Sequence, residues 1–138
     1  MITHTAQAKN AIKWIDSLKG GKKGYKKGTG ELGDNNENPQ RYCCLGVACR
    51  VLDVIPYSWK NGINYELVDK LGLHDVNGEF RNEGQSVNIE GVYCIIDMND
   101  DLYENDETFT RVRAFILKNL DVIFIPGVAE KLKQHYGK

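Results

Sequence analysis

The sequence predicts a single α+β domain, in which a small antiparallel sheet packs against a buried central helix and against N- and C-terminal helices. Three observations predict this class. Apolar residues recur at helical spacing near both ends of the chain, an apolar run at 43–52 has the character of a buried helix, and short strand-like segments lie between them. The chain has 138 residues, which is the length of one domain and enough to bury a core.

The first helix is expected at about 5–18, where apolar residues recur every three or four positions between lysines. Thr3 or Thr5 can cap its start, and two glycines at 20–21 end it. A lysine- and glycine-rich segment follows at 22–32. It has the charge and backbone freedom of a phosphate cradle but lacks the spacing of a phosphate-binding loop, so a mobile basic surface loop is the simpler interpretation.

The most distinctive segment lies at 41–52 and holds three of the four cysteines. We expect an exposed acidic insertion at 33–40, then a short strand at Tyr42. A buried helix follows at about 45–54, because its residues are apolar on nearly every side, and Pro56 prevents its continuation.

The cysteines of this segment lack the paired spacing of structural zinc sites, and the nearest histidine is His74. A nucleophilic cysteine would need a histidine that the fold places beside it. Buried cysteine is common as a small apolar residue. We therefore interpret all four cysteines as reduced and structural, ahead of metal binding or catalysis.

The middle of the chain predicts a short helix at 65–71, which a glycine ends. Asn77 and Gly78 predict a two-residue hairpin turn. A short strand is expected at 86–89, and a buried strand at 92–96 because of its β-branched content.

Two helices are expected toward the C-terminus. One runs from about 107 to 120 and buries Phe109 and the apolar residues that follow it at helical spacing. Arg111 and Arg113 on this helix project roughly 200° apart, so one of them alone is expected to reach any one pocket. From the residues alone, exposed surface charge is the simpler interpretation of both. Residues 121–125 could extend the helix or form a strand, and Pro126 is well placed to begin the last helix.

Composition and motifs favour a binding protein over an enzyme. The net charge of −1 gives no general attraction to nucleic acid polymers or to anionic membranes. No signal peptide is recognisable, and no apolar run approaches the roughly 20 residues that span a bilayer, so a cytoplasmic location is expected. Hydrolase motifs are absent, and we expect no cofactor and no metal. Scattered lysines and arginines, together with tyrosines, tryptophans and Phe80, would suit a ligand that carries phosphates and a flat base, which the composition permits without requiring it.

The run Arg-Tyr-Cys-Cys-Leu-Gly-Val-Ala-Cys at 41–49 follows a basic segment and precedes Met-Asn-Asp at 98–100 and Phe109. In these patches the chain resembles the first described family of phage proteins that counter the Thoeris defence system. An acidic insertion at 33–40 and a long connection at 100–106 depart from the family pattern.

This resemblance implies a non-catalytic sponge that sequesters cyclic ADP-ribose isomers and releases them unchanged. Some members also hold cyclic oligonucleotides at a separate site. It further implies a homo-oligomer built on dimers, in the cytoplasm of the infected bacterial host. Two alternatives stay open: an enzyme that degrades such a signal with His74 or a cysteine, and an inhibitor that binds a host protein through an apolar face.

The resemblance also implies ligand contacts from arginine on the late helix and from an aromatic residue. By position in the chain, the candidates are Arg111, Arg113, Phe80, Arg81, Asn88 and Asn99.

Overall fold

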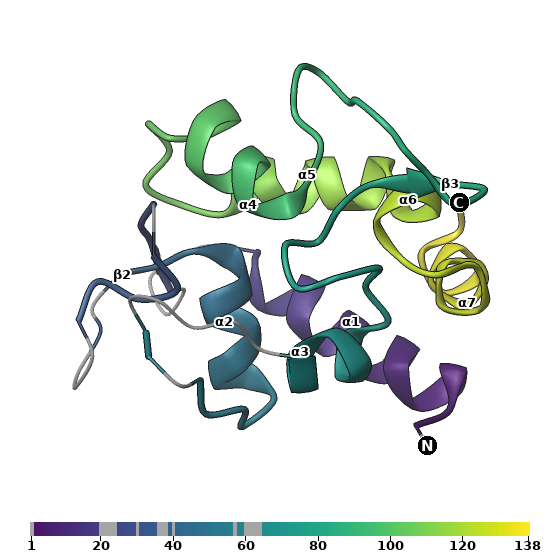
Figure 1. The fold of residues 1–138 in the computed structure, drawn as a ribbon. Helices are drawn as coiled ribbons and strands as arrows, with labels where there is room; N and C mark the ends of the chain where they lie inside the picture. Colours follow the sequence, from purple (N-terminus) through teal and green to yellow (C-terminus); the bar gives the residue numbers. More distant parts are fainter. Residues whose placement is uncertain are drawn as a thin grey trace.

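Most of the regular secondary structure is helical, and two separate pairs of very short strands accompany the helices (Figure 1). The computed structural model describes residues 2–19, 25–29, 31–35, 39, 41–56, 58–59 and 65–138. The predicted α+β class is confirmed. In Figure 1, α4, α5 and α6 form an upper layer and α1, α2 and α3 a lower one, and buried side chains from both layers make one core.

Helix α1 (His4–Ser17) confirms the first predicted helix. The Thr3 side chain caps it by accepting a hydrogen bond from the Ala6 amide at 3.1 Å. Its Trp14 is fully buried and donates from Nε1 to the carbonyl oxygen of Cys44 at 2.8 Å. The first helix is thereby joined to the central one. The glycines expected to end α1, and the start of the basic segment after it, lie outside the described residues.

Helix α2 (Cys44–Val51) is the predicted central helix, and its first six residues are buried. The thiol of Cys43 caps it by accepting from the Gly46 amide at 3.4 Å. The chain segment before the helix passes directly over Gly46, where any Cβ atom would overlap the carbonyl oxygen of Leu32. The glycine of the Cys-Cys-Leu-Gly-Val run is thus required by this close approach of two backbones.

The strands form two ladders instead of one sheet. Strand β1 (Lys26–Lys27) pairs in parallel with β2 (Arg41–Tyr42), and β3 (Arg81–Asn82) pairs antiparallel with β4 (Gln85–Ser86). The antiparallel sheet that the sequence predicts is therefore the β3–β4 hairpin, and the strand expected at Tyr42 joins the parallel pair.

The predicted hairpin turn at Asn77 and Gly78 is wrong. Gly78 does have a positive φ of 69°, but the Asp75 carboxylate accepts hydrogen bonds from the amides of Asn77 and Glu79, each at 3.0 Å. Such a side chain makes a local turn in place of a hairpin. The hairpin turn lies further on, at Glu83 and Gly84, whose φ angles are 52° and 80°.

The predicted strand at 92–96 is also wrong. Val92 makes a single bridge to Ile89, and α4 (Ile95–Asp97) begins immediately after Cys94. A π-helical turn, η1 (Met98–Leu102), continues it. Ile95 is fully buried as the first residue of this helix, although β-branched residues prefer strands.

The short helix α3 (Tyr65–Leu71) is confirmed, and Gly72 follows it with a φ of 73°. The last three helices are α5 (Thr110–Lys118), α6 (Leu120–Ile123) and α7 (Pro126–Tyr136).

Helix α5 buries the predicted apolar face. Helix α6 decides the open alternative at 121–125 in favour of a helix, after which Phe124 bridges to Leu73. Pro126 begins α7 as predicted. In the described part of the chain, no helix is both long enough and apolar enough to cross a membrane.

Candidate functional site

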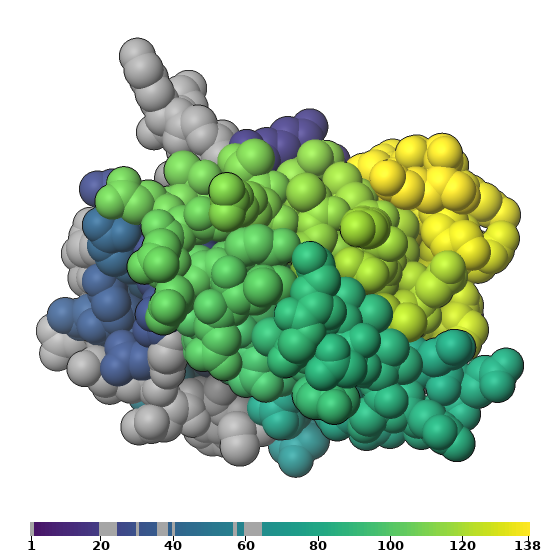
Figure 2. Space-filling model, turned by 90° about the horizontal axis from the view of Figure 1, so that it is seen from above, coloured from purple at the N-terminus to yellow at the C-terminus, as the bar shows by residue number. Residues whose placement is uncertain are grey.

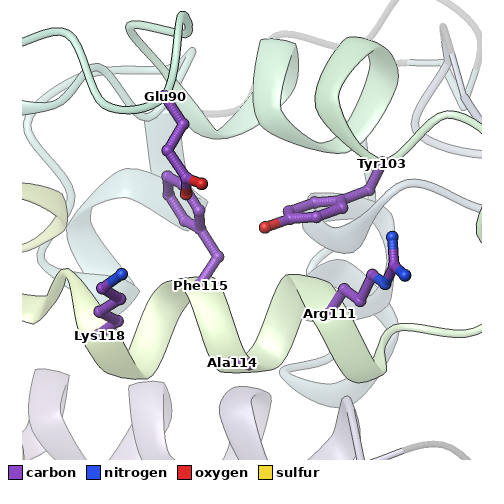
Figure 3. A pocket seen from close by; sticks show the side chains of 6 residues that line it. All are labelled: Glu90, Tyr103, Arg111, Ala114, Phe115 and Lys118. Carbon is purple, nitrogen blue, oxygen red and sulfur yellow. The ribbon is translucent and has the colours of Figure 1, made fainter.

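A hollow of about 370 Å³ on the outer side of α5 is the best candidate for a functional site (Figure 3). Its lining is formed by Glu90, Tyr103, Arg111, Ala114, Phe115 and Lys118, and we call it the α5 groove. Figure 2 shows that the segment before α5, α5 itself and the chain at 80–92 share this face of the molecule.

Helix α5 supplies four of these residues because their spacing places them on one helical face. Counted from Arg111, the other residues follow three, four and seven positions later: Ala114, Phe115 and Lys118. The rise of an α-helix separates Arg111 from Lys118 by roughly 10 Å along the axis. Both cationic side chains rise from α5 at opposite ends of the groove (Figure 3). The methyl group of Ala114 leaves room between them.

Aromatic rings line the groove beside these cations. Phe115 rises from α5 between them, and Tyr103 lies on the opposite side (Figure 3). The centre of the Phe115 ring lies 5.6 Å from that of the fully buried Phe80 ring and 6.2 Å from that of the Tyr103 ring, and the Tyr103 contact is edge-on. The Tyr103 hydroxyl points into the groove (Figure 3). Burial raises the pKa of Tyr103, and the nearby Glu90 carboxylate adds to the effect, so the phenol is a neutral hydrogen-bond donor.

Arg111 is held in place weakly. Its side chain is 72% exposed, and its Nε lies 4.0 Å from the Asp106 Oδ1. This separation is too long for a hydrogen bond. The Arg111 Nε therefore makes no hydrogen bond to this carboxylate oxygen, and the attraction between the two groups is weak.

Glu90 reaches the groove from a tight turn. Its φ is 53° and that of Gly91 is 92°, and Ile89 and Val92 exchange two backbone hydrogen bonds of 2.9 and 3.0 Å around them. The Asn88 side chain accepts from the Gly91 amide at 3.0 Å. A left-handed backbone is unfavourable for glutamate, so its presence here makes Glu90 a candidate for a role other than stability.

We expect Glu90→Asn to raise the free energy of unfolding by about 0.5 kcal/mol, because asparagine adopts left-handed backbone more readily than glutamate. Urea unfolding would measure the change. Glu83→Asn is the matched control, since Glu83 has the same backbone conformation in the other turn and lies outside the groove lining. A loss of stability in both variants would contradict the expectation.

The structure places only Arg111, of the six candidates, in the groove lining. Phe80 packs behind Phe115, and the exposed Asn88 accepts from the amide of Gly91, the residue after Glu90. Arg113 donates from Nε to the Ile15 carbonyl at 3.2 Å and lies 3.7 Å from Asp16, so it ties α5 to α1. Arg111 and Arg113 thus have different surroundings, as helical pitch predicts.

Arg81 and Asn99 also have partners away from the groove lining. Arg81 pairs with Glu79 at 3.2 Å and with Asp75 at 3.7 Å. Asn99 is fully buried, and its contacts join three segments of the chain. Its Oδ1 accepts from the Cys44 amide at 3.1 Å, and its Nδ2 donates to the Gly28 carbonyl at 3.0 Å.

Sequence reasoning missed Tyr103, Lys118 and Glu90. The spacing of seven between Arg111 and Lys118 was a usable signal, because it places both on one side of a helix. The other two come from turns that the sequence analysis did not predict.

The phosphate-cradle interpretation of the basic segment gains no support where the structure describes it. The Lys27 amide donates to the Glu107 carbonyl at 3.2 Å, and the Gly28 amide donates to the Tyr42 carbonyl at 2.7 Å. These amides face the protein. The Lys27 side chain is 2% exposed, and burial lowers the pKa of its ammonium group.

The four cysteines are free thiols, as the sequence predicts. Burial raises the pKa of Cys43 and Cys94 to about 11 and that of Cys49 to about 12, and it raises the pKa of Cys44 well above its usual value. Since the thiolate is the reactive form, these groups are poor nucleophiles near neutral pH. Among the described residues, no three potential metal-ligating side chains gather at one place.

In the native protein at about pH 8, we expect a thiol-reactive aromatic disulfide to modify at most Cys94 quickly, because the other thiols are buried and protonated. All four should react once the protein is unfolded. Spectrophotometric counting of released thiolate measures both states. Rapid modification of two or more native thiols would contradict the structural interpretation.

Comparison of the chain with protein-family models, with curated proteins and with solved structures finds no match.

Proposed function

We propose that this chain binds a small phosphorylated nucleotide in the α5 groove and sequesters it without chemical change. The ligand class we propose is the cyclic ADP-ribose isomers of Thoeris immunity, which the sequence resemblance implies, with the infected bacterial cytoplasm as the place of action. One observation carries the proposal: two cations stand two helical turns apart on α5, at the ends of a hollow with an aromatic wall.

The groove has the size and chemistry for such a ligand. Its volume of about 370 Å³ falls within the range of small-molecule sites. Arg111 and Lys118 can bind phosphate oxygens, and Arg111 can do so with two parallel hydrogen bonds. The ring of Tyr103 can stack on a base, and the Glu90 carboxylate can accept hydrogen bonds from ribose hydroxyl groups.

The same lining favours binding over catalysis. Its six residues include no histidine, cysteine or serine, and Glu90 is the single carboxylate among them. A nucleophile with an adjacent base, which covalent catalysis needs, is therefore missing from the lining.

Capture and release of the ligand tests the proposal. The purified protein is incubated with a cyclic ADP-ribose isomer, separated from free ligand, heated until it unfolds, and the released small molecule is analysed by mass spectrometry. We expect the intact ligand. An altered ligand would favour the degrading enzyme, and no captured ligand would favour the inhibitor of a host protein.

Arg111→Ala and Lys118→Ala are each expected to weaken nucleotide binding by about 2 kcal/mol, because each removes a charged donor to phosphate. Glu90→Asn should weaken binding less. Calorimetric titration measures the affinities. Lys131→Ala on α7 is the matched control for loss of one positive charge, since Lys131 is exposed and outside the groove lining. Unchanged affinity in the Arg111→Ala/Lys118→Ala double variant would exclude this groove as the site.

A further inference from the structure

Lys27 on β1 carries a buried charge for which the fold alone gives no reason. The residue is 2% exposed, and its Nζ atom has no hydrogen-bond partner among the described residues. Lysine is almost never fully buried unless it is paired, because removing an ammonium group from water costs free energy. A charge in this position therefore needs compensation from the groups around it.

Two carboxylates supply this compensation. The Lys27 amide donates to the carbonyl of Glu107 at 3.2 Å, which holds β1 against the residue that follows Asp106. Burial lowers the pKa of the Lys27 ammonium group, and the nearby carboxylates of Asp100 and Asp106 oppose this effect. Asp100 already accepts a hydrogen bond from Asn99 Nδ2 at 2.9 Å. Asp106 is therefore the carboxylate that depends more on Lys27.

Asp106 connects this buried charge to the α5 groove. Its Oδ2 is buried and has no hydrogen-bond partner in the described part of the chain, whereas its Oδ1 lies 4.0 Å from the Arg111 Nε. The Asp106 amide donates to the Tyr103 carbonyl at 3.2 Å, so its backbone is tied to a second residue of the groove lining. The negative charge of Asp106 thus attracts both a buried ammonium group and the guanidinium group of the groove.

We propose that Lys27 is a positioning residue of the α5 groove, whose buried charge offsets that of Asp106 and so leaves Arg111 available to bind an anionic ligand. Without Lys27, Asp106 would draw the Arg111 guanidinium group to itself and would place an uncompensated negative charge beside the phosphates. Salt screens buried charges less than surface charges, so the effect persists at physiological ionic strength. The inference rests on the proposed function, because it concerns the ligand class of the same groove.

A measurement without ligand tests the link to Arg111. The Arg111 Nε–H group makes no hydrogen bond to Asp106, so its proton should exchange rapidly with water. Lys27→Met, which keeps the length of the side chain, should slow this exchange by at least about threefold, because Asp106 then bonds to Arg111. Lys27→Met/Asp106→Asn should restore rapid exchange. NMR measures the exchange, with the signal assigned by its loss in Arg111→Ala. Unchanged exchange in Lys27→Met would overturn the proposal.

Calorimetric titration with a cyclic ADP-ribose isomer tests the consequence for binding. Lys27→Met should weaken binding about fivefold, because a positive charge near the phosphates is lost. Asp106→Asn should strengthen binding by a similar factor, and the double variant should bind within about twofold of the wild type. Lys26→Met is the matched control, since Lys26 precedes Lys27 on the same strand and is exposed; it should leave the affinity nearly unchanged.

The outcomes separate this inference from the proposed function. Weaker binding in Lys27→Met that Asp106→Asn does not restore would mean that Lys27 is only structural, and it would overturn the inference while the groove remains the site. Absence of binding by the wild-type chain would overturn the proposed ligand, and slowed Arg111 exchange in Lys27→Met would still support the electrostatic link. Thermal unfolding checks each variant. If Lys27→Met does not fold, a folded Asp106→Asn variant that fails to bind more tightly would overturn the inference.

Discussion

Gly46→Ala is expected to destabilise the fold by about 3 kcal/mol, at the upper end of the usual cost of overpacking. The added methyl group would overlap the backbone carbonyl oxygen of Leu32. This obstacle cannot rotate away as a side chain can. The same carbonyl accepts the Cys43 amide at 3.2 Å, so moving it would also disturb the residue that caps α2. Urea unfolding of the two proteins measures the difference.

Gly127→Ala gives a matched comparison, because its methyl group would overlap a side chain instead, the ring of His4. The imidazole can turn away, so the expected cost is below about 1 kcal/mol. His4→Ala should remove that cost in the double variant. If Gly46→Ala proved as mild as Gly127→Ala, the explanation of the motif glycine by backbone contact would be wrong.

Asn99→Leu is expected to cost about 3 kcal/mol, because it leaves a buried amide of Cys44 and the carbonyl of Gly28 without their partners. Asn99 also donates to the Asp100 side chain at 2.9 Å within the π-helical turn. Loss of these contacts would loosen η1, which positions Tyr103 directly after it. Thermal and urea unfolding measure the loss of stability.

Asn88→Leu is the matched control for Asn99→Leu. Asn88 is exposed, and its side chain makes one hydrogen bond, to the Gly91 amide, so a cost below about 1 kcal/mol is expected. Equal effects of the two substitutions would mean that the buried contacts of Asn99 add nothing beyond those of a surface asparagine.

The helices α1, α2 and α7 could be predicted because each depends on local signals. Their apolar residues recur with helical spacing, a threonine precedes the first, and Pro126 begins the last. Helix α2 is apolar on nearly every side, and the structure buries it accordingly.

The two errors have different causes. Asn77 and Gly78 have the composition of a hairpin turn, but the side chain of Asp75 accepts hydrogen bonds from the amides of Asn77 and Glu79. This contact is local, and the sequence analysis did not use it. Residues 92–96 have strand composition, but α4 begins at Ile95, whose side chain is buried in the core. That burial depends on distant parts of the chain and is not visible in the local residue pattern.

The candidate site was predictable to the same partial extent. Arg111 was a candidate only because the resemblance implied an arginine on the late helix, and Lys118 could have followed from its place on the same helical face. Tyr103 could not, because its position depends on the π-helical turn, which Asn99 attaches to α2 and to Gly28. Phe80 was predicted as an aromatic contact and instead lies behind Phe115, where it fixes the ring that faces the groove.

The two sides of the α5 groove differ in how freely they can change. The α5 side is fixed, because the same helix buries Val112 and Ile116 in the core. The Glu90 side is a surface turn, and the Glu90 side chain is exposed. The φ of 92° at Gly91 favours glycine there, but Glu90 itself can be exchanged without disturbing the core. The range of ligands that the groove accepts can evolve through one short turn while the helix that carries the cations stays constant.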